Sequence, residues 1–257
     1  MELQDIPPAI PVPLSEVGVV GVKVPLSFEY YKGRKIVVVP RFEAFVNLSA
    51  EKKGIHASRQ YETILEILSK YAGKTYKLEN VCADIAYELL NRQDGATKAK
   101  VRAIGEAILE RKTPVTGQVS YEPYQIIASA LALKLEGGRL QIKRKVGVGV
   151  RGMTACPCAQ ELMAEQAAAK LGEAEKRELL GKVPIATHMQ RSYGLLITSV
   201  PEKFEIDAFK LTEIVENSMS APSFGLLKRV DEVEIVRRAT EKPLFAEDVI
   251  RLMMVNF

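Results

Sequence analysis

The order of predicted elements repeats between the two halves of this 257-residue chain. Apolar alternation and β-branched runs predict strands over residues 18–31, 35–48, 99–110 and 117–129, and again over residues 140–150, 194–200 and 233–237. Apolar residues at helical spacing predict helices around residues 64–68, 81–89, 160–171, 208–218 and 246–254. The repeat indicates two modules, residues 1–135 and 136–257, with an extended proline-rich arm at the start of the first.

Two features of this pattern stay open at the level of the sequence. Residues 124–135 fit either a strand or a helix. The first module continues into a second pair of strands, whereas the chain stops after the predicted helix at residues 246–254. We therefore expect the second module to lack its last pair of strands, as in a shortened chain.

The composition excludes several classes of protein. Hydrophobic residues make up 47% and charged residues 26%, which is typical of globular domains rather than of disordered or fibrous chains. Tryptophan is absent and the net charge is only +4, so a base-stacking nucleic-acid platform is not expected. No apolar run approaches the roughly 20 residues of a membrane span, and three cysteines make no disulfide framework. These features, with an N-terminus unlike an export signal, predict a cytoplasmic protein.

Four residues could supply soft or borderline metal ligands. Cys156 and Cys158 flank Pro157 where a strand is expected to end and a helix to begin, and a helix N-terminus stabilises negative charge. The alternative is that both thiols are packed as small apolar groups. His56 and His188 are the only histidines, and each could instead hydrogen-bond a backbone group. One thiolate, one imidazole and one carboxylate would form a divalent metal site that leaves a position for water.

Charged residues near these motifs are further candidates. Glu232 is expected just before a strand, and Glu247 in the first turn of the last helix. Either could be an ordinary solvated carboxylate. Arg59, Arg191 and Lys228 could bind phosphate groups, although isolated surface cations are common.

Five motifs together resemble one family. They are residues 53–59 (KGIHASR), 153–160 (MTACPCAQ), 184–192 (PIATHMQRS), 225–232 (GLLKRVDE) and 243–248 (PLFAED). In order and spacing they are similar to the GTP cyclohydrolases of type IB and of the archaeal methanopterin pathway. The residues of the second and third motifs are closer to those of the archaeal branch. The resemblance covers essentially the whole chain.

The resemblance implies an α+β fold of tandem tunnelling-fold modules, in which antiparallel sheets carry helices on one face. It also implies a homo-oligomer, a dimer or tetramer, with active sites at subunit interfaces, and no nucleic-acid or membrane partner. The implied reaction converts GTP to 7,8-dihydroneopterin 2′,3′-cyclic phosphate with release of formate and diphosphate. The alternatives are the bacterial activity, which gives the triphosphate for folate, and a non-catalytic homologue that binds purine nucleotides.

The resemblance also assigns roles to residues. It implies that Cys156, His188 and Glu232 are metal ligands, most readily for Fe(II), with Mn(II) or Zn(II) as alternatives. Glu247 would accept hydrogen bonds from the guanine ring. Cys156 and His56 are the implied catalytic residues, with His56 near the substrate as an acid or base or as a phosphate partner. The cations Arg59, Arg191 and Lys228 would bind the phosphates. A histidine that completes the metal site lies in the family beyond the last helix of this chain, so a truncated chain, a three-ligand site and an inactive homologue all remain open.

Overall fold

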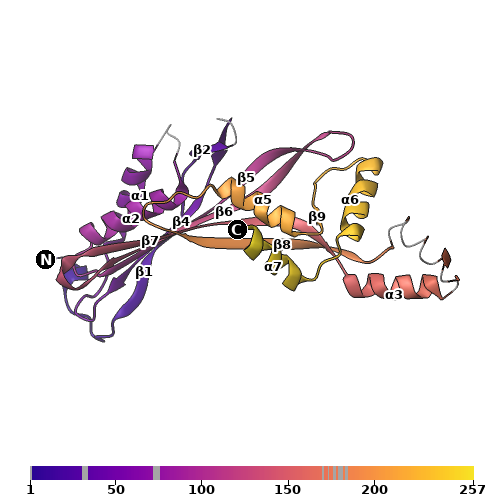
Figure 1. Ribbon diagram of the computed structural model, residues 1–257. Coiled ribbons are helices and arrows are strands. Elements are labelled where there is room, and N and C mark those ends of the chain that lie inside the picture. Colours follow the sequence, from indigo (N-terminus) through magenta and orange to yellow (C-terminus); the bar gives the residue numbers. More distant parts are fainter. Residues whose placement is uncertain are drawn as a thin grey trace. The chain divides into compact units, whose positions relative to one another are not determined.

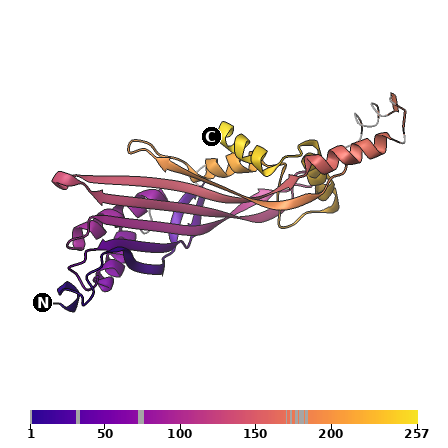
Figure 2. The same cartoon turned by 90° about the horizontal axis from the view of Figure 1, so that it is seen from below.

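A seven-stranded sheet forms the framework of the computed structural model (Figure 1). The described residues are 2–30, 34–71, 76–169, 171–172, 174–175, 178, 182 and 185–257. The strands follow the order β1 (Leu14–Lys23), β4 (Arg41–Leu48), β5 (Lys98–Lys112), β6 (Val119–Lys134), β7 (Leu140–Ala155) and β8 (Met189–Val200), and β9 (Ala221–Pro222) pairs with β7. Figure 2 shows the long magenta and pink strands side by side. The segment that fits either a strand or a helix therefore belongs to a strand, β6.

The chain divides into two compact units. Unit 1 comprises the described residues of Met1–Ala107, Gln125–Val148 and Ile197–Phe209, and unit 2 those of Ile108–Tyr124, Gly149–Leu196 and Lys210–Phe257. Strands β5 to β8 contribute residues to both units. A single cut in the chain does not produce these units, and the module boundary expected at residue 135 stays a prediction.

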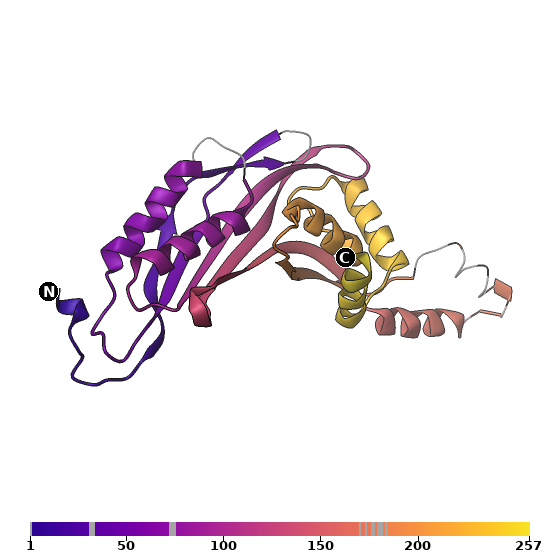
Figure 3. The same cartoon turned by 60° about the vertical axis from the view of Figure 1, so that its left-hand side comes forward.

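In unit 1, two helices cover one face of the sheet (Figure 3). Helix α1 (Ala57–Tyr71) packs against β1 and helix α2 (Leu78–Arg92), which in turn contacts β4. Strand β4 buries every second side chain, from Phe42 to Leu48, as expected for a strand with one face on the core. The two helices predicted between the first strands and the next pair of strands are confirmed as α1 and α2, and α1 begins at Ala57.

The residues around the first predicted strand pair form more elements than expected. A separate antiparallel hairpin, β2 (Leu26–Tyr30) and β3 (Arg34–Val38), follows β1, because Pro25 cannot donate to a sheet ladder. In β3 and just after it, Val38 is 1% exposed, whereas Val37 and Val39 are 67% and 52% exposed. The apolar run from Ile36 to Val39 therefore alternates between the core and solvent faces of a hairpin. The two strands predicted over residues 18–31 and 35–48 are four. The sequence Lys32-Gly33-Arg34 predicts a turn between these strands, and this segment lies mostly outside the described residues.

In unit 2, the strand predicted over residues 233–237 is wrong. Those residues belong to helix α6 (Arg229–Glu241), which follows helices α3 (Pro157–Ala168) and α5 (Ala208–Ser218) and precedes α7 (Ala246–Asn256). Glu234 pairs with Arg237 and Arg238 at helical spacing, and these hydrogen bonds lower the pKa of Glu234 to about 2. Burial recurs at Asp231, Ile235 and Ala239, which is the period of a helix and not of a strand.

A half-buried polar network attaches α5 to the sheet in unit 2. Arg111 of β5 donates to both carboxylate oxygens of Glu216 of α5, at 2.6 and 2.7 Å. Tyr124 of β6 donates to the same carboxylate at 2.6 Å. No described helix is long and apolar enough to cross a membrane.

We predict that Gly18→Ala lowers the free energy of unfolding by roughly 1–3 kcal/mol, as overpacking does. A Cβ added at Gly18 would lie 1.8 Å from the backbone oxygen of Ala44, so β1 and β4 would have to separate. Urea unfolding measures the change. Gly54→Ala is the control, because its Cβ meets only the Gln4 side chain, at 3.5 Å. Equal stability of the two variants would contradict the prediction.

Candidate functional site

A cavity of about 390 Å³ in unit 2 brings together two of the predicted metal ligands. Cys156 and His188 both contribute to its wall. Cys156 immediately precedes α3, whose first residue is Pro157, so the predicted helix start beside the cysteine is confirmed. The backbone N–H of Cys156 donates to the carbonyl of His188 at 3.1 Å, and Thr187 Oγ1 donates to the carbonyl of Cys156 at 2.6 Å. These bonds hold the two ligand segments against each other.

The start of helix α7 forms another part of the same wall. The backbone N–H of Leu244 donates to the carbonyl of Ala155 at 3.0 Å, which ties the chain before α7 to the residue before Cys156. Gln160 Nε2 donates to the carbonyls of Ile185 and Thr240, at 3.0 and 2.7 Å, and so links α3 with the segment before His188 and with the end of α6. The cavity is lined by Phe245 and Ala246, which directly precede the exposed Glu247. Sequence analysis missed Gln160, although an amide within the cysteine motif was a visible signal.

The third predicted ligand is not part of this wall. Glu232 is exposed in the first turn of α6 and does not line the cavity. Within the described part of the chain, Glu2, Asp5 and His56 form the one set of three donors that lie within 4.8 Å of one another. A single copy of the chain therefore places Cys156 and His188 at one cavity without gathering Glu232 around the same point.

The residue before Glu232 has a clear structural role. Asp231 is fully buried, and its carboxylate accepts hydrogen bonds from the backbone N–H groups of Val115 and Thr116, at 2.8 and 2.9 Å, and from Thr116 Oγ1, at 2.6 Å. The backbone N–H of Lys228 donates to it at 3.3 Å, across the first turn of α6. Burial raises the pKa of Asp231, but the hydrogen bonds lower it by more, so that it lies below the ordinary value. This carboxylate anchors the start of α6, and with it Glu232, to the turn between β5 and β6.

His56 belongs to unit 1, where the N-terminal arm covers it. It is 9% exposed, and its Nδ1 lies 2.7 Å from a carboxylate oxygen of Glu2 and its Nε2 3.5 Å from Asp5. The arm contains a short 3-10 turn, η1 (Leu3–Asp5), and is held by hydrogen bonds from the backbone of Lys53 to the carbonyls of Gln4 and Ile6. Arg59 of α1 pairs with Glu2 at 3.0 Å. Sequence analysis did not predict these acids beside His56, because nothing local links residues so far apart in the chain.

The remaining predicted phosphate ligands lie in unit 2. Arg191 of β8 lines a small cavity of about 180 Å³ together with Arg151 of β7, a second cation that sequence analysis did not single out. Lys228 is exposed and directly precedes α6. Two guanidinium groups at one cavity are suited to an anion, since each offers several N–H donors.

The protein thus has a mixed α/β fold with the Cys156 thiol and the His188 imidazole at one cavity. Residues 1–257 match the family described as "Type I GTP cyclohydrolase folE2", and the chain belongs to this family. It is 38% identical over 260 residues to a protein named GTP cyclohydrolase MptA from Methanosphaera stadtmanae, covering 99% of this chain and 83% of the relative. Proteins of the same name from Methanococcoides burtonii and Methanothermobacter thermautotrophicus are 39% and 40% identical, covering 97% and 98% of this chain and 80% and 81% of the relatives. The family resemblance and the fold class read from the sequence are confirmed.

We predict that Asp231→Asn lowers the melting temperature at pH 7 by on the order of 5 °C, because an amide cannot accept all four hydrogen bonds. Since the pKa of Asp231 in the folded state is below its ordinary value of 3.8, its stabilising effect is complete at neutral pH and is lost as the pH falls through the folded-state pKa. The difference between wild type and variant should therefore shrink below about pH 4.

Thermal unfolding without added metal between pH 3 and pH 7 tests this expectation. Glu232→Gln removes the same charge from the neighbouring exposed position and should leave the melting temperature unchanged. A difference for Asp231→Asn that stays constant down to pH 3 would contradict the assigned role of the carboxylate.

Proposed function

We propose that this chain is a metal-dependent GTP cyclohydrolase of the archaeal type, which acts on GTP in the cytoplasm for tetrahydromethanopterin biosynthesis. The observation that carries the proposal is the cavity shared by Cys156, His188 and the start of α7, which places two metal donors next to the helix that bears Glu247. The names of the methanogen relatives support the same activity.

The donor chemistry fits a divalent metal. A thiolate and an imidazole suit Fe(II) and Zn(II) better than Mg(II), and two such groups at one cavity leave positions for a carboxylate and water. When bound, the metal would activate water for attack on the guanine ring. Glu232, which lies outside the cavity in a single chain, would complete the ligand set in a homo-oligomer whose active sites lie between subunits.

The other residues bind and orient the substrate. The Glu247 carboxylate would accept hydrogen bonds from guanine N1–H and the 2-amino group, a pair of donors that adenine lacks. Arg191 and the neighbouring Arg151, with Lys228 and Arg59, would bind the phosphates. His56 would transfer a proton as acid or base, and the carboxylate of Glu2, 2.7 Å from its Nδ1, would orient the imidazole.

Anaerobic incubation with GTP and Fe(II), followed by oxidation and pterin fluorescence, tests the activity. We expect a fluorescent pterin, and chromatography should identify the 2′,3′-cyclic phosphate, with formate and diphosphate released. A triphosphate product would instead assign the bacterial activity. Nucleotide binding without pterin formation with Fe(II), Mn(II) or Zn(II) would contradict the proposal and favour the non-catalytic alternative.

We predict that Cys156→Ala abolishes both metal retention and pterin formation, whereas Cys158→Ala retains both. Cys156 lines the cavity with His188, while Cys158 is exposed within the first turn of α3 and does not line it. Metal per subunit, measured by mass spectrometry after gel filtration, separates the two variants. Retained metal in Cys156→Ala and lost metal in Cys158→Ala would overturn the assignment.

We predict that Glu247→Gln weakens GTP binding by about 1.5–3 kcal/mol, the range for a hydrogen bond to a charged group. Its metal content should hardly change, because the side chain does not line the cavity with Cys156. Calorimetric titration with GTP measures the effect. Glu165→Gln on α3 is the matched control, an exposed glutamate expected to leave affinity unchanged. Lost metal with unchanged GTP affinity would count against the role of Glu247.

A further inference from the structure

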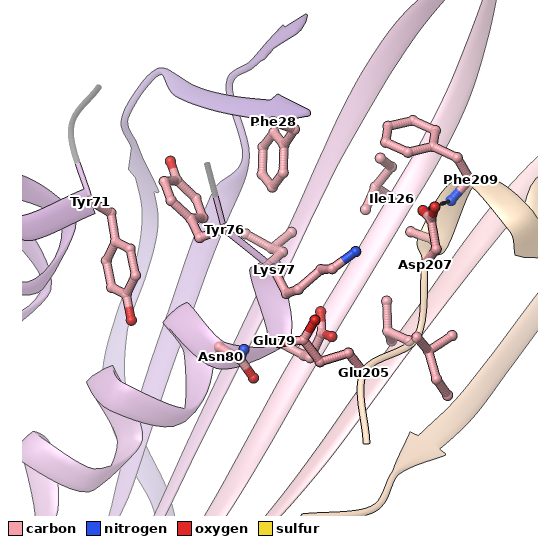
Figure 4. Close-up of a pocket in the computed structure, with 14 residues that line it drawn as sticks. Phe28, Tyr71, Tyr76, Lys77, Glu79, Asn80, Ile126, Glu205, Asp207 and Phe209 are labelled. Atoms are coloured by element: carbon pink, nitrogen blue, oxygen red, sulfur yellow. Dashed lines mark hydrogen bonds between the residues drawn. The ribbon is translucent and has the colours of Figure 1, made fainter. Parts of the chain in front are cut away.

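Unit 1 contains a larger cavity of its own, of about 660 Å³ (Figure 4). It lies between the start of α2 and the segment at residues 205–209 that leads into α5. Phe28, Tyr76 and Phe209 supply aromatic wall, and Ile126 supplies apolar wall. A volume of this size accommodates a small organic molecule, and flat apolar walls suit a planar ring.

One wall residue is a buried acid with an unsatisfied oxygen. Glu79, the second residue of α2, is 2% exposed, and no described residue hydrogen-bonds to its Oε1. Burial raises the pKa of Glu79. The hydrogen bond from its own backbone N–H and the charges of Lys77 and Arg144 lower the pKa by less, so it lies above the ordinary value. A buried polar atom without a partner is destabilising, so a ligand that donates hydrogen bonds to Oε1 would regain that free energy on binding.

The same acid occurs at the same helical position in unit 2. Helix α2 begins Leu78-Glu79-Asn80-Val81, and helix α7 begins Ala246-Glu247-Asp248-Val249. In both helices the second residue is glutamate, the third is a short polar residue, and the fourth is a valine that is buried. Over the whole chain, the two halves share only the order of their elements. At these two helix starts they also share residues.

The opposite wall of the cavity adds acidic groups. Arg144 donates to Asn80 Oδ1 and to the carbonyls of Pro201 and Glu202, at 2.8 and 3.0 Å, and so fixes the chain before residue 205 beside the start of α2. Figure 4 shows Glu205 next to Glu79, with Lys77 beside them. With Asp207, three carboxyl groups and one ammonium line this cavity, a charge that disfavours phosphate and favours a ligand rich in N–H donors.

We propose that this cavity is a second ligand site, in which Glu79 binds the adjacent ring N–H and amino group of a guanine or pterin ring. The class of ligand follows from the hydrogen bonds that a carboxyl group can accept from N–H donors and from the parallel with Glu247. The choice of a guanine or pterin ring therefore rests on the proposed function. The ring would lie among Phe28, Tyr76 and Phe209, with its sugar or side chain directed out of the acidic pocket. The source of the ring is either the base of the substrate or the pterin product.

The test is equilibrium binding to the full chain. The probes are neopterin, followed by fluorescence anisotropy, guanosine, followed by calorimetry, and adenosine, which lacks the paired donors. The variants are Glu79→Gln, Glu247→Gln and the double variant, with Glu62→Gln, an exposed glutamate on α1, as the control. Ala208→Trp, on the opposite wall, would fill the cavity while leaving Glu79 itself unchanged. This variant keeps the test decisive if Glu79→Gln does not fold.

We expect wild type and Glu62→Gln to bind two rings per chain, each single glutamate variant to bind one, and the double variant to bind none. Affinity at the site of Glu79 should fall at least about tenfold in Glu79→Gln. Selective loss of guanosine or of neopterin binding in that variant identifies the source. If the wild type binds a single ring, and only Glu79→Gln or Ala208→Trp abolishes its binding, the site at Glu79 is supported and the role of Glu247 in ring binding is contradicted. Binding that depends on Glu247 alone, or adenosine binding as strong as guanosine binding in the Glu247→Gln variant, overturns this inference and leaves the proposed function intact.

Discussion

Two adjacent backbone hydrogen bonds hold the candidate site together. The carbonyl of Ala155 accepts from Leu244, and the N–H of Cys156 donates to His188. Through them, the end of β7, the segment before β8 and the start of α7 meet at one cavity, although they are separated by about thirty to ninety residues of chain. The side chains that would bind a metal and a guanine ring depend on this junction for their positions.

Three acids at helix starts illustrate how the environment sets the role of a carboxylate. Asp231 is buried and fully satisfied by four donors, so its role is to fix the position of α6. Glu247 is exposed in α7 beside the cavity, free to meet a ligand. Glu79 is buried, and no described residue hydrogen-bonds to its Oε1, a costly arrangement that a ligand would relieve. All three occupy first turns, where the helix dipole favours negative charge.

The errors in reading the sequence have physical causes. In α6, the β-branched residues Val230, Val233 and Val236 are typical of a strand, but they are exposed, and the ion pairs of Glu234 stabilise a helix instead. The run from Ile36 to Val39 resembles a buried strand, but alternates between core and solvent in a hairpin. In both cases local propensity describes the residues, and the surroundings determine which side chains are buried.

The sequence by itself determined the chemistry available and its local setting. It placed a thiol before a proline at a helix start, two histidines, and Glu247 in a first turn, because caps, turns and periodicity depend on near neighbours. Only the tertiary structure decided which of these groups meet. Cys156 joins His188 but not Glu232, the N-terminal arm supplies Glu2 and Asp5 to His56, and Glu79 is enclosed opposite residues 205–209. These contacts join residues far apart in the chain, so they follow from how the strands and helices pack and not from any local pattern.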